Sequence, residues 1–296
     1  MKAEARSGVA VVDKPRGVTS HTVVAQARRL WGRKDVGHAG TLDPMATGVL
    51  LLLVGQATKL SGYLTADSKR YAAEVTFGRA TDSLDADGRT TVEAPLGADQ
   101  LSSPAVEHAL ALERARAEQV PPAVSAIKVD GERSYALARK GEAPELAARA
   151  IRVLELTLLE LAPPVVRVEL HVSKGYYVRS LARDLGAGLG APAHLSALRR
   201  LASGPFDLSR ATSWPPSAPP ALLGLAEAAS SVMPLARLKP EAVLRARQGK
   251  QLLPEDFDEL PDSEGPGAWL SPEGELLAIG TTRGELRVVR GFNSEL

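Results

Sequence analysis

The first candidate for a chemical role is one carboxylate in a glycine-rich segment. Asp43 lies within residues 37–48, which hold three glycines and an Asp-Pro pair and precede the apolar residues 49–54. An Asp-Pro pair alone often starts a turn or caps a helix. Glycines, however, let a backbone approach a ligand closely, and a buried strand after the run would hold it in place. A carboxylate so placed can be a nucleophile, a general base or a metal ligand.

A metal role is the weakest of these three. Residues 81–88 look like a calcium loop, but with Gly88 as the sixth position the first would be Ser83 and the twelfth Ala94, so both required carboxylates are missing. We expect a turn with Asx hydrogen bonds there instead. A phosphate-binding Gly-x4-Gly-Lys-Ser/Thr run is absent. The histidines show no ligand spacing; they are His21, His38, His108, His171 and His194.

Three further segments carry polar and aromatic side chains together. Residues 69–71 join a lysine, an arginine and a tyrosine at a strand start, which suits an unstacked base and equally suits an ordinary strand end. Residues 173–179 add a glycine, two tyrosines and Arg179, which could pair with a buried carboxylate or lie on the surface. Residues 194–201 contain an Arg-Arg pair and also fit a core edge with a charged rim.

Composition sets the class of protein. Of 296 residues, 44% are hydrophobic and 24% charged, as in globular domains, and there is no cysteine, which excludes disulfides and thiolate chemistry and fits a reducing compartment. The net charge is +1, but residues 1–210 carry 28 Lys and Arg against 23 Asp and Glu, and the remainder carries 8 against 12. Attraction to phosphate depends on such a local charge balance, although ordinary solvated surface charge explains the same distribution.

Residues 1–7 lack an apolar signal core and residues 49–54 are too few to span a bilayer, so we expect a cytoplasmic protein without a membrane span.

The elements that must position these groups mix strands and helices without a regular βαβ repeat, which favours an α+β fold. Residues 166–172 alternate apolar and polar side chains, as a strand with one wet face does. The other expected strands are 9–12, 49–54, 70–77 and 151–161. The expected helices run from Thr19 or Ser20 to 31, and over 56–64, 103–112, 132–140 and 177–189.

A composition break occurs at the proline-rich residues 214–220. Beyond it we expect helices over 222–231 and 240–248, then short strands at 268–270, 275–279 and 285–289 with a hairpin turn at 271–274. We therefore predict a catalytic domain over 1–220 and a small β-rich domain over 221–296, with a linker at about 211–221.

Taken together, these segments resemble the tRNA pseudouridine synthase B (TruB) family. The resemblance implies a pseudouridine synthase domain with a mixed, largely antiparallel sheet, followed more loosely by an RNA-binding PUA-like domain. Tyr176 departs from the family by replacing a smaller residue beside the pocket, and Ala39 stands where threonine is common. Seven segments carry the likeness in the family's order: 12–17, 37–48, 69–71, 81–85, 121–128, 173–179 and 198–200.

The resemblance implies that Asp43 is the nucleophile that isomerises uridine-55 in the T-loop of tRNA. Arg179 would form an ion pair with Asp43, and Tyr71 would pack against the flipped uracil. The implied catalytic residues are Asp43, Tyr71 and Arg179, and the implied substrate-binding residues are Lys14, His38, Tyr71, Tyr177 and Leu198. The C1′–N1 bond breaks and a C1′–C5 bond forms with no atom or redox equivalent exchanged, so we expect no metal and no cofactor. A monomer that binds the tRNA T-arm without a guide RNA is expected.

Three alternatives remain. A hydrolase that uses Asp43 with Asp82 or Asp85 would release a free base or sugar. A non-catalytic RNA-binding protein would not depend on Asp43. A guide-RNA-dependent relative is disfavoured by the short tail without basic extensions. Whether Asp43 attacks the sugar, attacks the base or assists a glycal route is open.

Overall fold

The computed structural model describes residues 7–65, 68–97, 99–124, 128–129, 132–133 and 146–293. These residues form two compact units, and the chain passes between them more than once. Residues up to Asp43, from Val49 to Thr65 and from Ser203 onward make the first unit; residues from Pro44 to Gly48 and from Ser68 to Ala202 make the second. The domain boundary expected near residue 220 rests on composition and family resemblance, and it stays a prediction.

The N-terminal part of the first unit is built on strands whose side chains are almost entirely buried. The continuous apolar run 49–54 is at most 1% exposed at every position, as expected for a strand covered on both faces. Helix α1 begins at a Thr19 cap, whose hydroxyl accepts from the Thr22 N–H, and ends at Gly32 in the left-handed conformation. The elements are β1 (Gly8–Lys14), α1 (Ser20–Trp31), β2 (Val36–Ala39), β3 (Thr47–Val54), the 3-10 helix η1 (Gly55–Leu60) and α2 (Ser61–Leu64).

One expectation in this region is wrong. The run 37–48 does not begin as a loop, because its first residues belong to β2, which pairs antiparallel with β3 and places His38 opposite Leu52. The glycines at positions 37 and 40, which weaken a strand pattern, hid this short strand.

The C-terminal part of the first unit contains a five-stranded sheet in the order β17-β16-β18-β19-β20. The expected hairpin is confirmed, since β18 and β19 pair antiparallel on either side of residues 271–275. The third expected strand lies later, at β20, and the helix expected over 240–248 begins as a 3-10 turn. The elements after Ser203 are β14 (Phe206–Asp207), η2 (Leu208–Arg210), β15 (Thr212–Ser213), α6 (Leu225–Ser230), β16 (Leu235–Leu238), η3 (Pro240–Ala242), α7 (Val243–Arg247), η4 (Pro254–Asp256), β17 (Phe257–Glu259), β18 (Pro266–Leu270), β19 (Leu276–Thr281) and β20 (Val288–Gly291).

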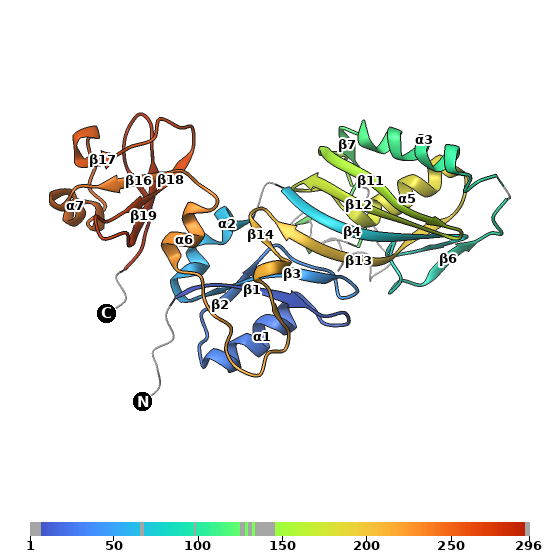
Figure 1. The fold of residues 1–296 in the computed structure, drawn as a ribbon, viewed down its shortest axis with the longest axis horizontal. Coiled ribbons are helices and arrows are strands. Elements are labelled where there is room, and N and C mark those ends of the chain that lie inside the picture. The colour runs from blue at the N-terminus through green and yellow to red at the C-terminus, as the bar shows by residue number, and fades with distance from the viewer. Residues whose placement is uncertain are drawn as a thin grey trace. The chain divides into compact units, whose positions relative to one another are not determined.

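The second unit is a sheet in the order β11-β12-β4-β13, covered by two helices (Figure 1). Neighbouring strands β11, β12 and β4 are antiparallel, and the expected alternation on β12 is confirmed by the buried residues Val166, Val168, Leu170 and Val172. Helix α3 packs on α5 and β11, and α5 packs on β4. The elements are β4 (Ser68–Phe77), α3 (Ser103–Arg114), β11 (Val153–Ala162), β12 (Val165–Ser173), α5 (Val178–Leu189) and β13 (Ala193–Ser203).

Strand β13 was not expected from the sequence. Its burial alternates, but the buried position after Leu198 is Arg200, whose side chain has no exposed surface. A charged residue on the buried face hides the period of two that reveals a strand.

Short strand pairs complete the second unit. The helix expected over 132–140 is wrong at its start, because Glu132 and Arg133 pair antiparallel with Val129 and Lys128, and such cross-strand pairing overrides local helix propensity. Residues 134–140 lie outside the described part of the chain. The pairs are β5 (Arg79–Thr81) with β6 (Thr90–Glu93), β7 (Glu118–Gln119) with β10 (Arg149–Ala150), and β8 (Lys128–Val129) with β9 (Glu132–Arg133). None of the helices in the described residues has the length and apolar character needed to cross a membrane.

Candidate active site

The loop that carries Asp43 is fixed from the side of α1. Ser20, the first residue of α1, is buried, and its hydroxyl accepts from the Leu42 N–H at 2.9 Å and donates to the Leu42 carbonyl at 3.2 Å. Leu42 and Met45 are themselves buried, whereas Asp43 between them is half-exposed. The sequence therefore places a carboxylate at an accessible point of a loop whose neighbouring residues are anchored.

The far end of the same loop docks on β13. Thr47 and Gly48 pair in parallel with Arg199 and Arg200, and the Thr47 hydroxyl lies 3.5 Å from the Leu198 carbonyl, to which it donates. Gly48 has φ +102°, and a Cβ there would lie 2.1 Å from the Arg200 carbonyl oxygen. Only glycine permits this approach, so the glycine noted in the sequence has a definite structural reason. The predicted pocket residue Leu198 thus lies beside the end of the Asp43 loop.

Lys14 and His38, both in the first unit, make different kinds of contact. Lys14 is fully buried, and its ammonium group donates to the carbonyls of Pro15 at 2.9 Å and Val18 at 2.8 Å, as a buried charge requires. His38, on β2, makes an edge-to-face contact with His21 of α1 at 5.5 Å between ring centroids. Roles for Lys14 and His38 at the target nucleotide stay predictions.

The three residues 69–71 divide between two faces of β4. Tyr71 is buried opposite Leu170, and Lys69 shares its face because side chains alternate along a strand. Burial, followed by the charges of Arg200 and Lys174, lowers the pKa of Lys69 to about 8. Positive charge therefore gathers at the start of β4 on the face that carries Tyr71.

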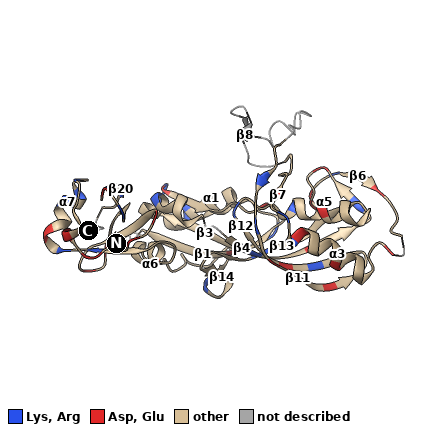
Figure 2. Ribbon diagram, turned by 90° about the horizontal axis from the view of Figure 1, so that it is seen from above, with Lys and Arg blue, Asp and Glu red and all other residues tan. Residues whose placement is uncertain are grey.

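Arg70 points to the opposite, wet face of this sheet. There it pairs with Glu169 at 2.5 Å, and the neighbouring Arg167 bridges Glu74 and Glu160. Figure 2 marks basic positions in blue and acidic positions in red along the chain. Arg70 is thus engaged with a carboxylate, and the polar and aromatic side chains of residues 69–71 do not all lie on one face of the sheet.

Arg179, the second residue of α5, is held in the second unit by several acceptors. Its guanidinium donates to the carbonyls of Ser83 at 3.1 Å and Val124 at 2.9 Å, and its Nε lies 3.7 Å from Oδ2 of Asp85. Arg179 and Asp85 are both buried. Arg179 and Asp43 belong to different compact units, and the ion pair between them stays a prediction.

Asp85 is a functional candidate whose ionic contact with Arg179 was not predicted from the sequence. Its Oδ1 accepts from the Ser83 hydroxyl at 2.6 Å and from the Asp87 N–H at 3.1 Å, which confirms the expected Asx turn. Leu84 adopts φ +63°, a conformation that is rare for a leucine. Oδ1 of Asp85 therefore bonds within the turn, and Oδ2 faces Arg179.

Tyr177 caps the beginning of α5, as the predicted helix 177–189 implies. Its side chain is half-buried, and its backbone is held by the carboxamide of the buried Gln119. The Tyr177 N–H donates to Gln119 Oε1 at 2.8 Å, and Gln119 Nε2 donates to the Tyr177 carbonyl at 3.2 Å. The predicted residues therefore fall into two sets: Lys14, His38 and Asp43 in the first unit, and Tyr71, Tyr177, Arg179 and Leu198 in the second.

Comparison with known protein families decides the affiliation of this chain. The model of the TruB family pseudouridylate synthase N-terminal domain matches residues 28–178, which is half of the chain. The chain belongs to the TruB family. The model of the tRNA pseudouridylate synthase B C-terminal domain matches residues 179–214.

Relatives align over nearly the whole length. The tRNA pseudouridine synthase B of Syntrophotalea carbinolica is 38% identical over 307 aligned positions, covering 97% of this chain and 98% of that protein. The tRNA pseudouridine synthase B of Thermobifida fusca is 42% identical over 285 positions, covering 93% and 94%. The TruB affiliation predicted from the ordered segments is thereby confirmed.

Solved structures confirm the fold. A chain in the structure of an H/ACA RNP bound to a substrate RNA containing 2′-deoxyuridine matches with a TM-score of 0.71 at 23% identity, covering 97% of this chain and 85% of that one. A chain in a Cbf5-Nop10-Gar1 complex matches with a TM-score of 0.72 at 24% identity, covering 97% and 84%. The α+β architecture with mixed and antiparallel sheets is thus a fold shared with these chains.

Proposed function

We propose that this TruB-family chain is a tRNA pseudouridine synthase that isomerises uridine-55 in the T-loop, with Asp43 as its nucleophile. The observation that carries the assignment of Asp43 is its loop, in which a half-exposed carboxylate follows a residue pinned by Ser20. Relatives that align over more than nine-tenths of the chain are named tRNA pseudouridine synthase B, which supports the substrate and the reaction.

The proposed reaction needs a flipped uridine and a carboxylate. Unstacking the base costs roughly a few kcal/mol, which stacking and phosphate contacts offset. With Asp43, the C1′–N1 bond breaks, the uracil turns while bound, and C1′ joins C5. The proton lost from C5 is balanced by the proton that N1 gains, so the product is an isomer of the substrate.

The remaining predicted residues receive roles in the same proposal. Arg179 keeps the Asp43 carboxylate ionised and oriented, because a nearby opposite charge favours the charged form. Tyr71 stacks on the uracil and is a candidate for proton transfer. Lys14, His38, Tyr177 and Leu198 hold the nucleotide.

We also propose how the enzyme works in the cell. It acts as a monomer in the cytoplasm on the T-arm stem-loop, without a guide RNA. Residues 1–220 form the catalytic domain, and residues 221–296 form a PUA-like domain that adds RNA contacts.

The decisive experiment mixes the purified protein with a T-arm stem-loop and nothing else. Nucleoside analysis by mass spectrometry should find pseudouridine at one position and no free uracil. Asp43→Asn should abolish turnover and keep RNA affinity within about tenfold, because phosphate and stacking contacts dominate binding. Asp262→Asn, which alters an exposed carboxylate, is the matched control and should leave turnover unchanged.

Other outcomes separate the alternatives. Release of free base would indicate a hydrolase, and turnover that appears only with added RNA would indicate a guide-dependent enzyme. RNA binding without any pseudouridine would indicate a binding protein. Substantial turnover in Asp43→Asn would falsify the nucleophile assignment.

A further inference from the structure

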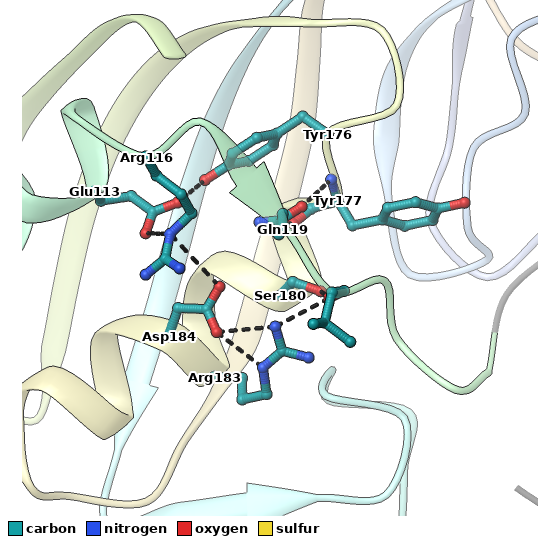
Figure 3. A network of polar contacts seen from close by, with 9 residues as sticks. Glu113, Arg116, Gln119, Tyr176, Tyr177, Ser180, Arg183 and Asp184 are labelled. Carbon is teal, nitrogen blue, oxygen red and sulfur yellow. Dashed lines mark hydrogen bonds and ion pairs between the residues drawn. The ribbon is translucent and has the colours of Figure 1, made fainter. Parts of the chain in front are cut away.

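A partly buried cluster of charged and aromatic side chains, with Glu113 and Tyr176 at its buried end, joins α3 to the beginning of α5 in the second unit (Figure 3). Glu113, in the last turn of α3, accepts from the Tyr176 hydroxyl at 2.8 Å and from Arg116 Nε at 2.6 Å. Arg116 Nε lies 3.9 Å from Oδ2 of Asp184 on α5, and Arg183 Nε donates to the other oxygen of Asp184 at 2.8 Å. The cluster thus links the two helices through alternating charges.

Burying the Glu113 carboxylate costs free energy unless its ionic and hydrogen-bonded partners are held in place. Its side chain is 1% exposed, and a carboxylate near a helix C-terminus opposes the helix dipole. A buried charge needs ionic and hydrogen-bonded partners to be tolerated. Burial, the charge of Glu113 and the bond to it raise the pKa of the Tyr176 hydroxyl well above its usual value, so this phenol stays protonated and donates. The hydroxyl is therefore a fixed anchor rather than a titrating group.

This anchor acts on the residue next to Tyr177. The link from β12 to α5 contains Gly175 at φ +87°, exposed and free of side-chain restraint. Immediately after it, Tyr176 is tied to Glu113 through its ring, and Tyr177 is bridged by Gln119 through both of its backbone groups. Figure 3 shows the two tyrosine rings pointing to opposite sides. Holding Tyr176 therefore sets the direction in which the Tyr177 ring leaves the backbone.

The segment that carries Gln119 is itself fastened to α5. The Val120 carbonyl accepts from the Ser180 hydroxyl at 2.9 Å and from Arg183 at 3.0 Å. Four residues later, the Val124 carbonyl accepts from Arg179. Residues 119–124 thus bond to the start of α5 at several points. The same segment holds the backbone of Tyr177, through Gln119, and the guanidinium of Arg179, through the Val124 carbonyl.

We propose that Glu113, Tyr176 and Gln119 are positioning residues of the reaction, which hold the Tyr177 ring and the Arg179 guanidinium in their working orientation. This inference rests on the proposed function and deepens it. None of the three touches the substrate in this proposal; they act through the backbone at the start of α5. Their loss should lower the rate of the chemical step more than RNA affinity, because small displacements of catalytic groups affect the barrier strongly.

The test measures the single-turnover rate constant of pseudouridine formation, the RNA dissociation constant and the melting temperature for each variant. Tyr176→Phe removes only the hydroxyl, and Gln119→Glu keeps the acceptor for the Tyr177 N–H but loses the donor to its carbonyl. Each should lower the rate constant about tenfold at temperatures well below melting, with the dissociation constant changed less than about twofold. Glu107→Gln is the control, since Glu107 is an exposed residue of the same helix paired with Arg114.

A double variant makes the test specific to the cluster. If Tyr176 acts through Glu113, adding Tyr176→Phe to Glu113→Gln should lower the rate constant much less than Tyr176→Phe does alone, because coupled residues are not additive. An unchanged rate constant in both Tyr176→Phe and Gln119→Glu, or loss of RNA affinity equal to loss of rate, overturns the inference. If Tyr176→Phe does not fold, Gln119→Glu alone decides. A wild-type protein without activity would instead refute the proposed function.

Discussion

The hydroxyl of Ser20 satisfies both backbone polar groups of Leu42, although 22 residues separate them in the chain. One side chain thus replaces the two hydrogen bonds that a regular element would give this position. Because Leu42 directly precedes Asp43, the same hydroxyl limits the conformations available to the proposed nucleophile.

We expect Ser20→Ala to impair both stability and turnover. It leaves the N–H and C=O of a buried residue without their observed partner, which costs about 1–3 kcal/mol for such a group. The free energy of unfolding from urea titration should fall by that amount, and the single-turnover rate should fall further than RNA affinity. Ser230→Ala, which removes an exposed hydroxyl bonded to the Glu227 carbonyl, is the control. Equal behaviour of the two variants would contradict the positioning role of Ser20.

The lowered pKa of Lys69 predicts a pH dependence of stability. Its pKa is about 8 in the folded protein, because burial and then the charges of Arg200 and Lys174 disfavour the proton, whereas a lysine in the unfolded chain has the usual pKa of 10.5. Between these values the unfolded chain holds more protons at Lys69, so its contribution to the free energy of unfolding rises with pH. Below pH 8 both states are protonated and this contribution is constant.

Urea unfolding at several pH values between 7 and 10 checks this expectation. Relative to Lys69→Met, the wild type should gain stability as pH rises above about 8. The control is Arg70→Met, because Arg70 stays charged on the opposite face of β4. Parallel curves for wild type and Lys69→Met would show that the Lys69 pKa is ordinary.

Removing Asp85 should destabilise the second unit strongly. Asp85→Ala removes a buried carboxylate whose Oδ2 lies 3.7 Å from Nε of the buried Arg179, and breaking such a buried pair typically costs about 3–5 kcal/mol. Asp82→Ala is the matched control, since Asp82 is exposed and its carboxylate accepts from the Arg89 N–H. Chemical denaturation of both variants measures the difference. A loss for Asp85→Ala no larger than that for Asp82→Ala would mean that the pair contributes little.

Gly48→Ala should disrupt the end of the Asp43 loop. The added Cβ would meet the Arg200 carbonyl oxygen, a backbone atom that cannot turn aside, so strand β13 or the loop must shift. Gly17→Ala provides the control, because Gly17 also has a positive φ, at +86°, but nothing lies within 4 Å of its added Cβ. It should show only the backbone cost, about 1 kcal/mol. Equal melting temperatures and equal turnover for the two alanine variants would argue against a role for the close approach.

Local patterns in the sequence predicted many of the elements. The unbroken apolar run of β3, the alternation of β12 and the α5 pattern closed by Gly190 are signals within a few residues of the chain. The family affiliation was predictable because short segments recur in a fixed order. These features do not depend on which distant residues meet.

Features that depend on distant partners were not predictable. The buried Arg200 disguised β13, and the bonds of Ser20 to Leu42 and of Asp85 to Arg179 join residues far apart in the chain. The lysine, arginine and tyrosine of residues 69–71 are adjacent in the sequence, but a strand divides them between two faces. In each case the side chain itself carries no signal of the partner that gives it its role.

The Glu113–Tyr176 bond has a consequence for how this chain could have evolved. A carboxylate at position 113 without the phenol would lose a buried donor, and a tyrosine at position 176 without the carboxylate would bury an unsatisfied hydroxyl. We therefore expect either residue alone to destabilise the protein relative to the pair, so that the effects of the two substitutions are coupled. Among related proteins, a tyrosine at this position should be inherited together with an acidic residue at the end of α3.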